Sequence, residues 1–243
     1  MKAVILAGGK GTRLIPYTRI LPKSLVPIGD RPIMEILIKQ LQHAGVTEMV
    51  LAVGHLDKLI RSYFQDGSDW GVKITYSLEK EPLGTVGPLA MIKGLDSTFM
   101  VTNSDVLTTV PLEELIRFHK ETGAIATIAM HKREVKISLG VIKHDLDFHV
   151  VDYVEKPSSA YMASMGIYVF EPRILKYIIP GKYLDFPTLV KILLEAGENV
   201  QGYPFDGYWQ DLGNPGEYEQ AQLDFVKMKK LFLPDEDNEP ISD

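Results

Sequence analysis

The sequence contains no cysteine among its 243 residues. A disulfide framework, a thiolate metal site and a cysteine nucleophile are therefore excluded. No stretch reaches the roughly 18 uncharged apolar residues of a membrane-spanning helix. The first apolar run meets Gly8 and Gly9 too early for a secretory signal peptide. From these absences we expect a cytoplasmic protein.

The sequence also has no excess of positive charge, because its 26 Lys and Arg residues are outnumbered by 32 Asp and Glu residues. The formal net charge is −6, and residues 234–243 contain five acidic side chains and no basic one, so the rest of the chain is nearly neutral. A nearly neutral body argues against the basic face of a general nucleic-acid-binding protein. We expect one domain over residues 1–232 and an acidic, disordered tail over residues 233–243, because the tail has little apolar surface to bury.

Short apolar runs rich in β-branched residues alternate with helical patterns in the first half of the chain. The expected strands cover residues 2–7, 48–54, 72–78 and 98–105, and the expected helices begin at Ile33, Leu56 and Gly87. After Gly123, strands follow with less helix between them, and two helical segments close the chain. This order predicts a Rossmann-like α/β fold: a mixed, mainly parallel sheet flanked by helices, with added mixed strands in the second half.

Three glycines between residues 8 and 11 follow the first expected strand, and Arg13 and Lys23 come soon after them. The spacing is not that of a Rossmann fingerprint, because Leu14 stands where the third glycine should be, and it is not that of a P-loop. Glycines let main-chain N–H groups approach anionic oxygens, and Arg and Lys supply positive charge. A tight turn would explain the glycines alone. With the two cations, the segment predicts a site for a nucleoside triphosphate.

Six segments carry a more specific resemblance. The segment LAGGKGTRLIPYTRILPKSLVPI (6–28) is similar to the signature G-G-x-G-T-R-L-x-P-x-T-x-x-x-P-K-x-L of the sugar-1-phosphate nucleotidyltransferases. The segments that resemble later motifs of this family, in family order, are EKEPLGTVGPLA (79–90), NSD (103–105), VEKP (154–157), MGIYVF (165–170) and YWQDLGNP (208–215). Within the family, residues 79–91 and 111–124 most resemble mannose-1-phosphate guanylyltransferases. We expect no C-terminal β-helix domain in this chain, although many relatives carry one.

The resemblance implies transfer of a nucleotidyl group from an NTP to a sugar-1-phosphate, which gives an NDP-sugar and pyrophosphate. Arg13 and Lys23 would be catalytic, contacting the triphosphate and the charge that develops on pyrophosphate. The implied nucleotide-binding residues are Leu6, Ala7, Gly8, Gly9, Gly11, Thr12, Arg13, Lys23, Glu81, Gly84, Thr85 and Asp105. Glu81 would read an edge of the base, and Gly84 would let the backbone lie close to it. By its sequence alone, residues 81–87 could equally be a helix start bounded by proline and glycine.

A magnesium site is implied at Asp105 and Asp211, because Mg²⁺ prefers carboxylate and phosphate oxygens. Each aspartate by itself could have a simpler role. Asp105 could cap a loop, and Asp211 could share a helix N-cap with Asn214. Only the two family motifs taken together favour the metal interpretation.

The implied sugar-phosphate site consists of Gly140, Glu155, Lys156 and Gly166. Lys156 would be the third catalytic residue and bind the phosphate of the acceptor, and Glu155 would accept hydrogen bonds from sugar hydroxyls. Without the resemblance, an ion pair at a surface strand end would be the preferred interpretation of residues 155 and 156. Either glycine could equally lie at a β-bulge.

The substrate pair is less well determined than the reaction. GTP with mannose-1-phosphate is the preferred pair, but Ser164-Met165-Gly166 stands where many relatives have Asn-Ala-Gly, so a related hexose or heptose phosphate stays open. Uridylyl or thymidylyl transfer to glucose-1-phosphate is an alternative, as is a catalytically silent nucleotide-sugar-binding regulatory subunit. We expect no nucleic-acid or membrane partner, and a homo-oligomer remains open.

Overall fold

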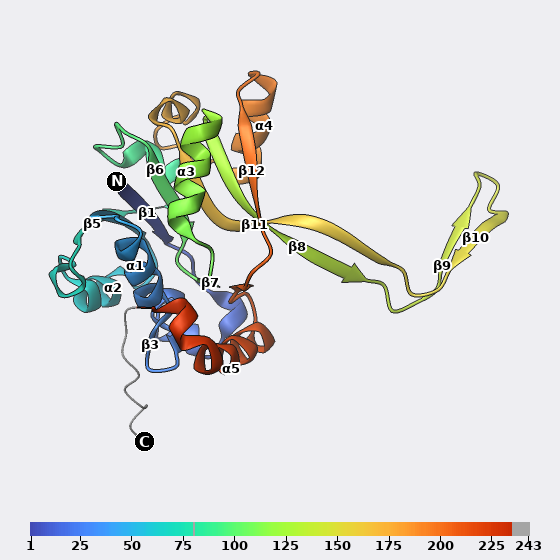
Figure 1. Ribbon diagram of the computed structural model, residues 1–243, viewed down its shortest axis with the longest axis horizontal. Helices are drawn as coiled ribbons and strands as arrows, with labels where there is room; N and C mark the ends of the chain where they lie inside the picture. Colours follow the sequence, from blue (N-terminus) through green and yellow to red (C-terminus); the bar gives the residue numbers. More distant parts are fainter. Residues whose placement is uncertain (80, 235–243) are drawn as a thin grey trace.

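Seven strands form the central sheet of the computed structural model, which describes residues 1–79 and 81–234 (Figure 1). Across the sheet they are β12 (Val200–Phe205), β8 (Ala126–Lys136), β11 (Ser158–Phe170), β6 (Phe99–Asn103), β1 (Lys2–Ala7), β4 (Glu48–Val53) and β5 (Lys73–Leu78). Only β11 runs antiparallel to its neighbours, β6 and β8; the other four pairings are parallel. The predicted mixed, mainly parallel sheet is therefore confirmed.

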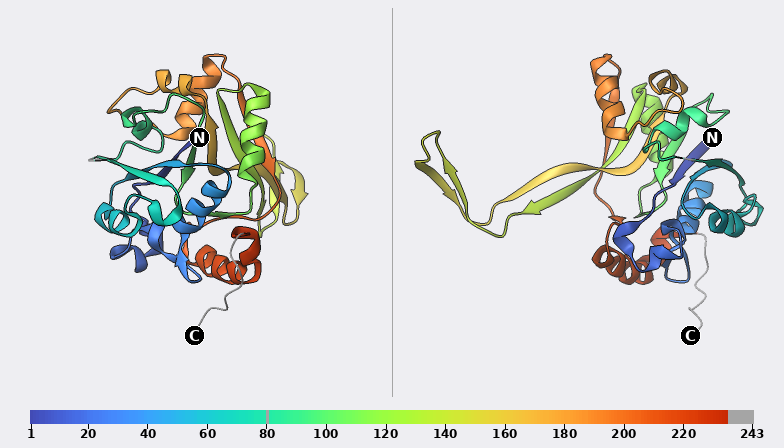
Figure 2. Two further views of the ribbon diagram at one scale, coloured as in Figure 1. Left: turned by 60° about the vertical axis from the view of Figure 1, so that its left-hand side comes forward. Right: turned by 180° about the vertical axis from the view of Figure 1, so that it is seen from behind.

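Helices cover both faces of this sheet (Figure 2). One face packs against α1 (Ile33–His43), α2 (Asp57–Phe64) and α3 (Leu112–Thr122), whose apolar stripes include Leu37, Phe64 and Leu115. The other face packs against α4 (Phe186–Glu195) and the 3-10 segments η5 (Gly87–Met91) and η6 (Pro172–Tyr177). Burial of these side chains stabilises the fold by about 25 cal/mol for each Å² of apolar surface removed from water.

One expected helix takes a different form. The segment that begins at Gly87 forms the short 3-10 segment η5 instead of an α-helix. Its start is tied to another part of the chain, because the backbone N–H of Gly87 donates to the carbonyl of Leu184 at 3.1 Å. Only residues 87–94 lie between this start and Gly94, which is too short a segment for a stable α-helix of several turns.

The remaining short elements lie in the connections between these strands and helices. They are η1 (Thr12–Leu14), η2 (Tyr17–Arg19), η3 (Lys23–Leu25), β2 (Pro27–Ile28), β3 (Arg31–Pro32), η4 (Ser68–Trp70), β7 (Val106–Thr108) and β13 (Trp209–Asp211). The last helix, α5 (Pro215–Phe232), packs Phe225 and Phe232 against Leu107 and Leu212. This third apolar cluster holds α5 against the rest of the body.

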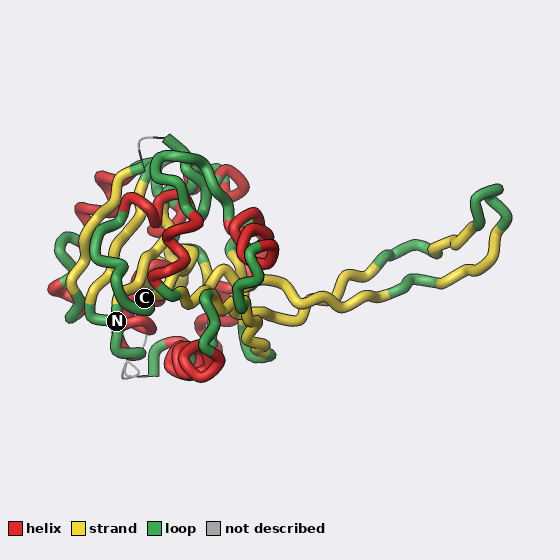
Figure 3. Tube along the Cα trace, turned by 90° about the horizontal axis from the view of Figure 1, so that it is seen from above, coloured by secondary structure: helices red, strands yellow, loops and turns green. Residues whose placement is uncertain are grey.

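The outer halves of β8 and β11 leave the body as a two-stranded ribbon, seen clearly in Figure 3. The ribbon continues into a hairpin of β9 (Val141–His144) and β10 (Val150–Val154). We refer to residues 130–164 as the arm. The sequence predicts its strands, but the projection away from the body is a finding of the structure.

The body extends slightly further than the expected domain. Leu233 is only 3% exposed and packs in the α5 cluster, so the body includes the first residue of the expected tail. Residues 235–243 lie outside the described residues. Within the part that is described, no helix is long and apolar enough to cross a membrane.

Candidate active site

The three glycines form a loop at the carboxyl end of β1, whose last residues are Leu6 and Ala7. Gly11 has a φ of +60°, and a Cβ there would lie 2.8 Å from the Thr18 methyl group. The Thr18 hydroxyl donates to the Gly11 carbonyl at 2.7 Å and fixes the turn before Thr12. A Cβ on Gly9 would meet no atom within 4 Å. Backbone conformation and packing therefore account for Gly11. The open space at Gly9 leaves room for a ligand to approach the backbone.

Lys23 connects this loop to the two candidate metal ligands. Its ammonium group forms an ion pair with Asp105, and its Nζ lies 3.9 Å from Oδ1 of Asp211. Asp105 follows β6 and precedes β7, and Asp211 ends β13. Because β13 pairs antiparallel with β7 and sets Asp211 opposite Val106, the two carboxylates become neighbours. The structure therefore brings together three residues that the sequence places up to 188 positions apart.

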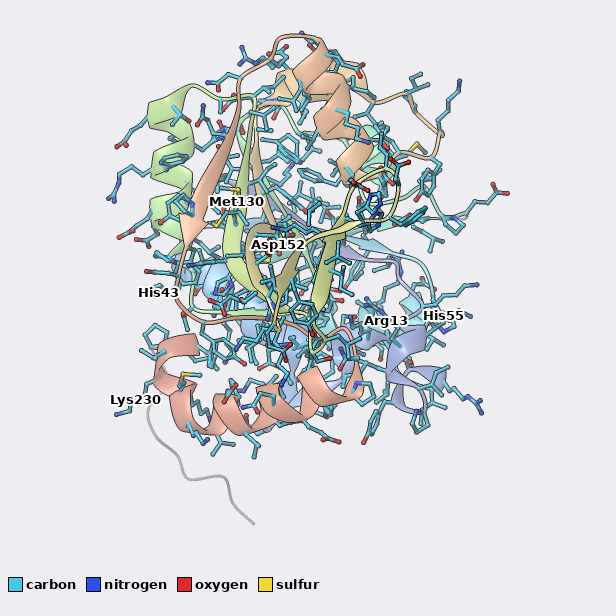
Figure 4. The ribbon with its side chains drawn as sticks, turned by 90° about the vertical axis from the view of Figure 1, so that its right-hand side faces the viewer. Arg13, His43, His55, Met130, Asp152 and Lys230 are labelled. Carbon is cyan, nitrogen blue, oxygen red and sulfur yellow. The ribbon has the colours of Figure 1, made fainter. Side chains whose placement is uncertain are left out.

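Arg13 lies beside the same cluster, next to α5 (Figure 4). A Cβ on Gly213 would be 3.2 Å from the Arg13 Nη1 and 3.3 Å from the Asp211 Oδ2, so both groups border this glycine. Asn214 is the N-cap of α5 and accepts the backbone N–H of Glu217 at 3.1 Å. Asp211 therefore has no share in the helix cap.

The pKa of Asp211 reflects burial and the charged groups around it. Burial raises the pKa of its carboxyl group, and the negative charge of Asp105 raises it further, while Lys23 and Arg13 lower it. Two carboxylates in one place are costly unless cations compensate them. In the described ranges 1–79 and 81–234, no group of three or more His, Cys, Asp or Glu side chains could hold a metal ion. Two carboxylates with phosphate oxygens from a substrate are nevertheless a usual donor set for Mg²⁺.

The segment 81–87 packs against the residues at the start of α4 and just before it. Gly84 has a φ of +79°, and a Cβ there would be 2.5 Å from the Leu184 carbonyl oxygen. The Thr85 hydroxyl accepts the backbone N–H of Phe186 at 2.8 Å. Packing therefore accounts for Gly84 without a ligand, and the side chain of Glu81 is exposed.

Sequence reasoning missed Glu79, which lies against the glycine loop. A Cβ on Gly8 would be 2.8 Å from its Oε1. Burial raises the pKa of Glu79, although a weak hydrogen bond from the backbone N–H of Leu83 opposes this. A partly buried carboxylate beside a phosphate loop leaves its acceptor oxygens available to a base or ribose donor. Its position at the start of the motif 79–90 was the available signal.

Asn103 is a second residue that sequence reasoning missed. It ends β6, and its side chain covers Gly166, where a Cβ would lie 2.6 Å from the Asn103 Nδ2. Gly166 has a φ of +74° and lies where the register between β11 and β8 shifts. The two residues place an amide and a bare backbone segment beside the site. The segment NSD contained the signal, but its aspartate is the more obvious chemical group.

The other expected sugar-phosphate residues lie on the arm. The Glu155 and Lys156 side chains are 60% and 68% exposed and form an ion pair at 3.6 Å. Gly140 lies against the hydroxyl group of Tyr153 near the start of the hairpin. Figures 1 and 3 show this hairpin far from β1, so within one chain the structure does not bring these residues to the glycine loop.

Comparison with known proteins identifies the family. A family model described as "Nucleotidyl transferase" matches residues 2–227. The chain belongs to the nucleotidyl transferase family. This confirms the resemblance carried by the six segments, and the matched range includes both the body site and the arm.

Curated relatives of this chain are named for different substrates. A mannose-1-phosphate guanyltransferase from Candida albicans is 41% identical over 90% of this chain and 62% of its own length. A UTP–glucose-1-phosphate uridylyltransferase from Synechocystis is 36% identical over 91% of this chain and 62% of its own. The chain thus spans about three-fifths of these curated relatives.

Solved structures support the fold. A putative glucose-1-phosphate thymidylyltransferase from Bacillus anthracis superposes with a TM-score of 0.73 over 99% of this chain and 98% of that one, at 21% identity. HddC from Yersinia pseudotuberculosis, complexed with GMP-PN, gives a TM-score of 0.70 at 26% identity over 92% of this chain and 99% of its own.

Proposed function

We propose that this protein transfers a nucleotidyl group from an NTP to a sugar-1-phosphate, releasing pyrophosphate. The supporting observation is the cluster in which Arg13 and Lys23 meet Asp105 and Asp211 beside a glycine loop with open space above it. Nucleotidyl transfer joins two anions, and its main requirements are charge neutralisation and alignment. Two fixed cations next to a carboxylate pair meet the first requirement.

The proposed reaction is a single in-line displacement. A phosphate oxygen of the sugar-1-phosphate attacks the α-phosphorus, a P–O bond forms, and the bond between the α- and β-phosphates breaks. Arg13 and Lys23 hold the triphosphate and stabilise the charge that moves onto the leaving pyrophosphate. Asp105 and Asp211 would hold Mg²⁺, which when bound neutralises phosphate oxygens. No residue is required as a covalent nucleophile.

Substrate recognition is divided between the body and the arm. In the body, Glu79, Glu81 and the loop around Gly84 face the nucleoside, and Asn103 with Gly166 faces the sugar. Glu155 and Lys156 on the arm supply a hydroxyl acceptor and a cation for the sugar phosphate. Their exposure leaves both side chains available to a ligand.

GTP with mannose-1-phosphate is the preferred pair. Support comes from the name of the 41% identical relative and from the complex of HddC with GMP-PN. Transfer from UTP to glucose-1-phosphate is the second candidate, favoured by the cyanobacterial relative. We place the reaction in the cytoplasm, with neither nucleic acid nor membrane as a partner.

Pyrophosphate release tests this proposal. The wild-type protein is assayed with each of the four NTPs against mannose-1-phosphate and glucose-1-phosphate, with and without Mg²⁺. Lys23→Ala should lower turnover by about a hundredfold or more, because a group aimed at transition-state charge is lost. Lys73→Ala is the matched control. Lys73 is an exposed lysine at the amino end of β5, whereas the proposed site lies at the carboxyl ends of the parallel strands. Nucleotide binding without pyrophosphate release under every condition would favour the silent regulatory subunit.

A further inference from the structure

The arm carries an unusual share of the exposed apolar surface. Of the 24 large hydrophobic side chains that are exposed in the described residues, eleven lie between positions 135 and 162. They are Val135, Ile137, Leu139, Ile142, Leu146, Phe148, Val150, Val151, Tyr153, Tyr161 and Met162. An isolated two-stranded ribbon is marginally stable in water, and exposed apolar patches of this kind mark interaction surfaces.

Strand pairing between β8 and β11 keeps the arm extended away from the body of its own chain. Pairing between β8 and β11 runs without a break from Ser158 opposite Lys136 to Ser164 opposite Met130, and the register shifts only at the root, before Tyr168. Neither paired stretch contains a glycine at which the ribbon could fold back. Figure 2 shows the same projection from behind. The arm therefore needs a surface outside its own chain.

The body offers an apolar surface beside its glycine loop. Ile15, Tyr17 and Ile20 are 46%, 51% and 75% exposed, directly after the phosphate-binding segment. The same site lacks the Glu155 and Lys156 that the arm carries. Both the exposed arm and the incomplete, apolar-rimmed site thus belong to every copy of the chain.

We propose that two copies of this chain exchange arms, and that each arm places Glu155 and Lys156 at the nucleotide site of the other copy. This inference rests on the proposed function, because it assigns the sugar-phosphate residues of that site to a partner. A reciprocal exchange is two-fold symmetric and uses one pair of complementary surfaces twice. Each arm brings eleven exposed apolar side chains to the contact, and stable contacts between proteins usually bury about 1,200–2,000 Å² in total.

Complementation between two impaired variants tests the exchange, with sugar-1-phosphate held well below the wild-type KM so that the loss in Lys156→Ala limits the rate. Lys156→Ala disables the arm, and Asp211→Asn disables the body site. The two chains are co-expressed with different tags, and the mixed dimer is isolated by both tags in turn. In the mixed dimer the intact body receives the intact arm, so we expect about half of the wild-type activity, from one working site of two.

A second pair of variants is the matched control. Lys156→Ala and Glu155→Gln both alter the arm, so every site in their mixed dimer receives one defective arm. At the same low sugar-1-phosphate concentration, the rate of this pair should stay as low as the rates of its parents. Recovery in the first pair but not in the second supports exchange, and no recovery in the first pair with an active wild-type protein overturns it.

Cross-linking tests the exchange without an activity. Because the chain has no cysteine, Ser159→Cys on one preparation and Ile20→Cys on another introduce one thiol each. A short bismaleimide added after the two are mixed, unfolded and refolded should join arm to body in covalent dimers. Joining only within a chain that carries both cysteines would overturn the proposal. Cross-linked dimers of the two cysteine variants, together with no pyrophosphate release from the wild-type protein, would refute the proposed function and leave the exchange intact.

Discussion

Asp211 holds a charge where the fold does not favour one. Its pKa is raised by burial and by Asp105, so the folded state binds a proton there more tightly than the unfolded state. The free energy of unfolding therefore falls as pH rises through the window between the ordinary aspartate pKa of 3.8 and the raised one, and the loss is complete above it. A carboxylate that by itself destabilises the fold is consistent with the proposal that this site binds a cation together with its substrate.

Asp211→Asn should raise the melting temperature at pH 7.5 and lower pyrophosphate release by about a hundredfold or more. The stability gain should shrink as pH falls toward 4, because the wild-type carboxyl group then becomes neutral as well. Thermal unfolding across pH and initial rates measure the two effects. Asp105→Asn is the contrasting variant: it removes the partner of Lys23 and should lower stability. Equal destabilisation by both substitutions would contradict this account of Asp211.

Substitutions at Lys156 and at Arg13 should change different kinetic parameters. Lys156→Ala should raise the KM for sugar-1-phosphate about tenfold or more and the KM for NTP much less, because its cation faces the acceptor. Arg13→Ala should act chiefly on kcat and on nucleotide affinity, and Arg13→Lys should recover only part of the loss, since lysine cannot replace a planar fork. Initial rates with each substrate varied at a saturating level of the other measure this. Loss of NTP binding in Lys156→Ala with unchanged sugar-phosphate affinity would reverse the proposed orientation.

At the scale of elements, the junction of β11 with β6 joins the site to the arm. Gly166 lies at the register shift, with a positive φ and with Asn103 over its backbone. The arm ends at Ser164, two residues before Gly166. A change at this junction therefore affects both the sugar side of the site and the root of the ribbon.

Gly166→Ala should destabilise the protein more than Gly181→Ala. Both glycines have a φ of +74°, so both variants incur the backbone cost of about 1–2 kcal/mol. Only at residue 166 would the new methyl group also meet a side chain, since nothing lies within 4 Å of a Cβ at Gly181. Denaturant unfolding measures the difference, and the KM for sugar-1-phosphate should rise in Gly166→Ala alone. Equal effects at the two positions would show that Asn103 moves aside freely.

At the scale of the whole molecule, arm exchange makes stability depend on protein concentration. The melting temperature should rise between about 0.1 and 10 µM, because association stabilises the folded chain by mass action. Leu146→Ser separates the two states: this side chain is 98% exposed in the single chain, so its loss leaves a monomer unchanged but weakens a dimer that covers it. A melting temperature independent of concentration, with Leu146→Ser equal to the wild type, would indicate a stable monomer.

The sequence by itself determined the fold class and most of the strands, and it predicted the glycine loop as a phosphate site. Local periodicity and turn residues carry that information, and Arg13 and Lys23 lie within one short motif next to the glycines. Through resemblance, the later motifs predicted Asp105 and Asp211 as metal ligands. Nothing in the sequence pattern could show that Glu79 lies against Gly8 or that Asn103 covers Gly166.

Only the tertiary structure decided which of these residues meet. Asp105 and Asp211 become neighbours because β13 pairs with β7, a contact between segments about 100 residues apart. Glu155 and Lys156 stay apart from the loop because β8 and β11 pair with each other beyond the edge of the body. Alternating side chains predict a strand, but the direction of a ribbon depends on its pairing partners and on where its register shifts, which are properties of the folded chain.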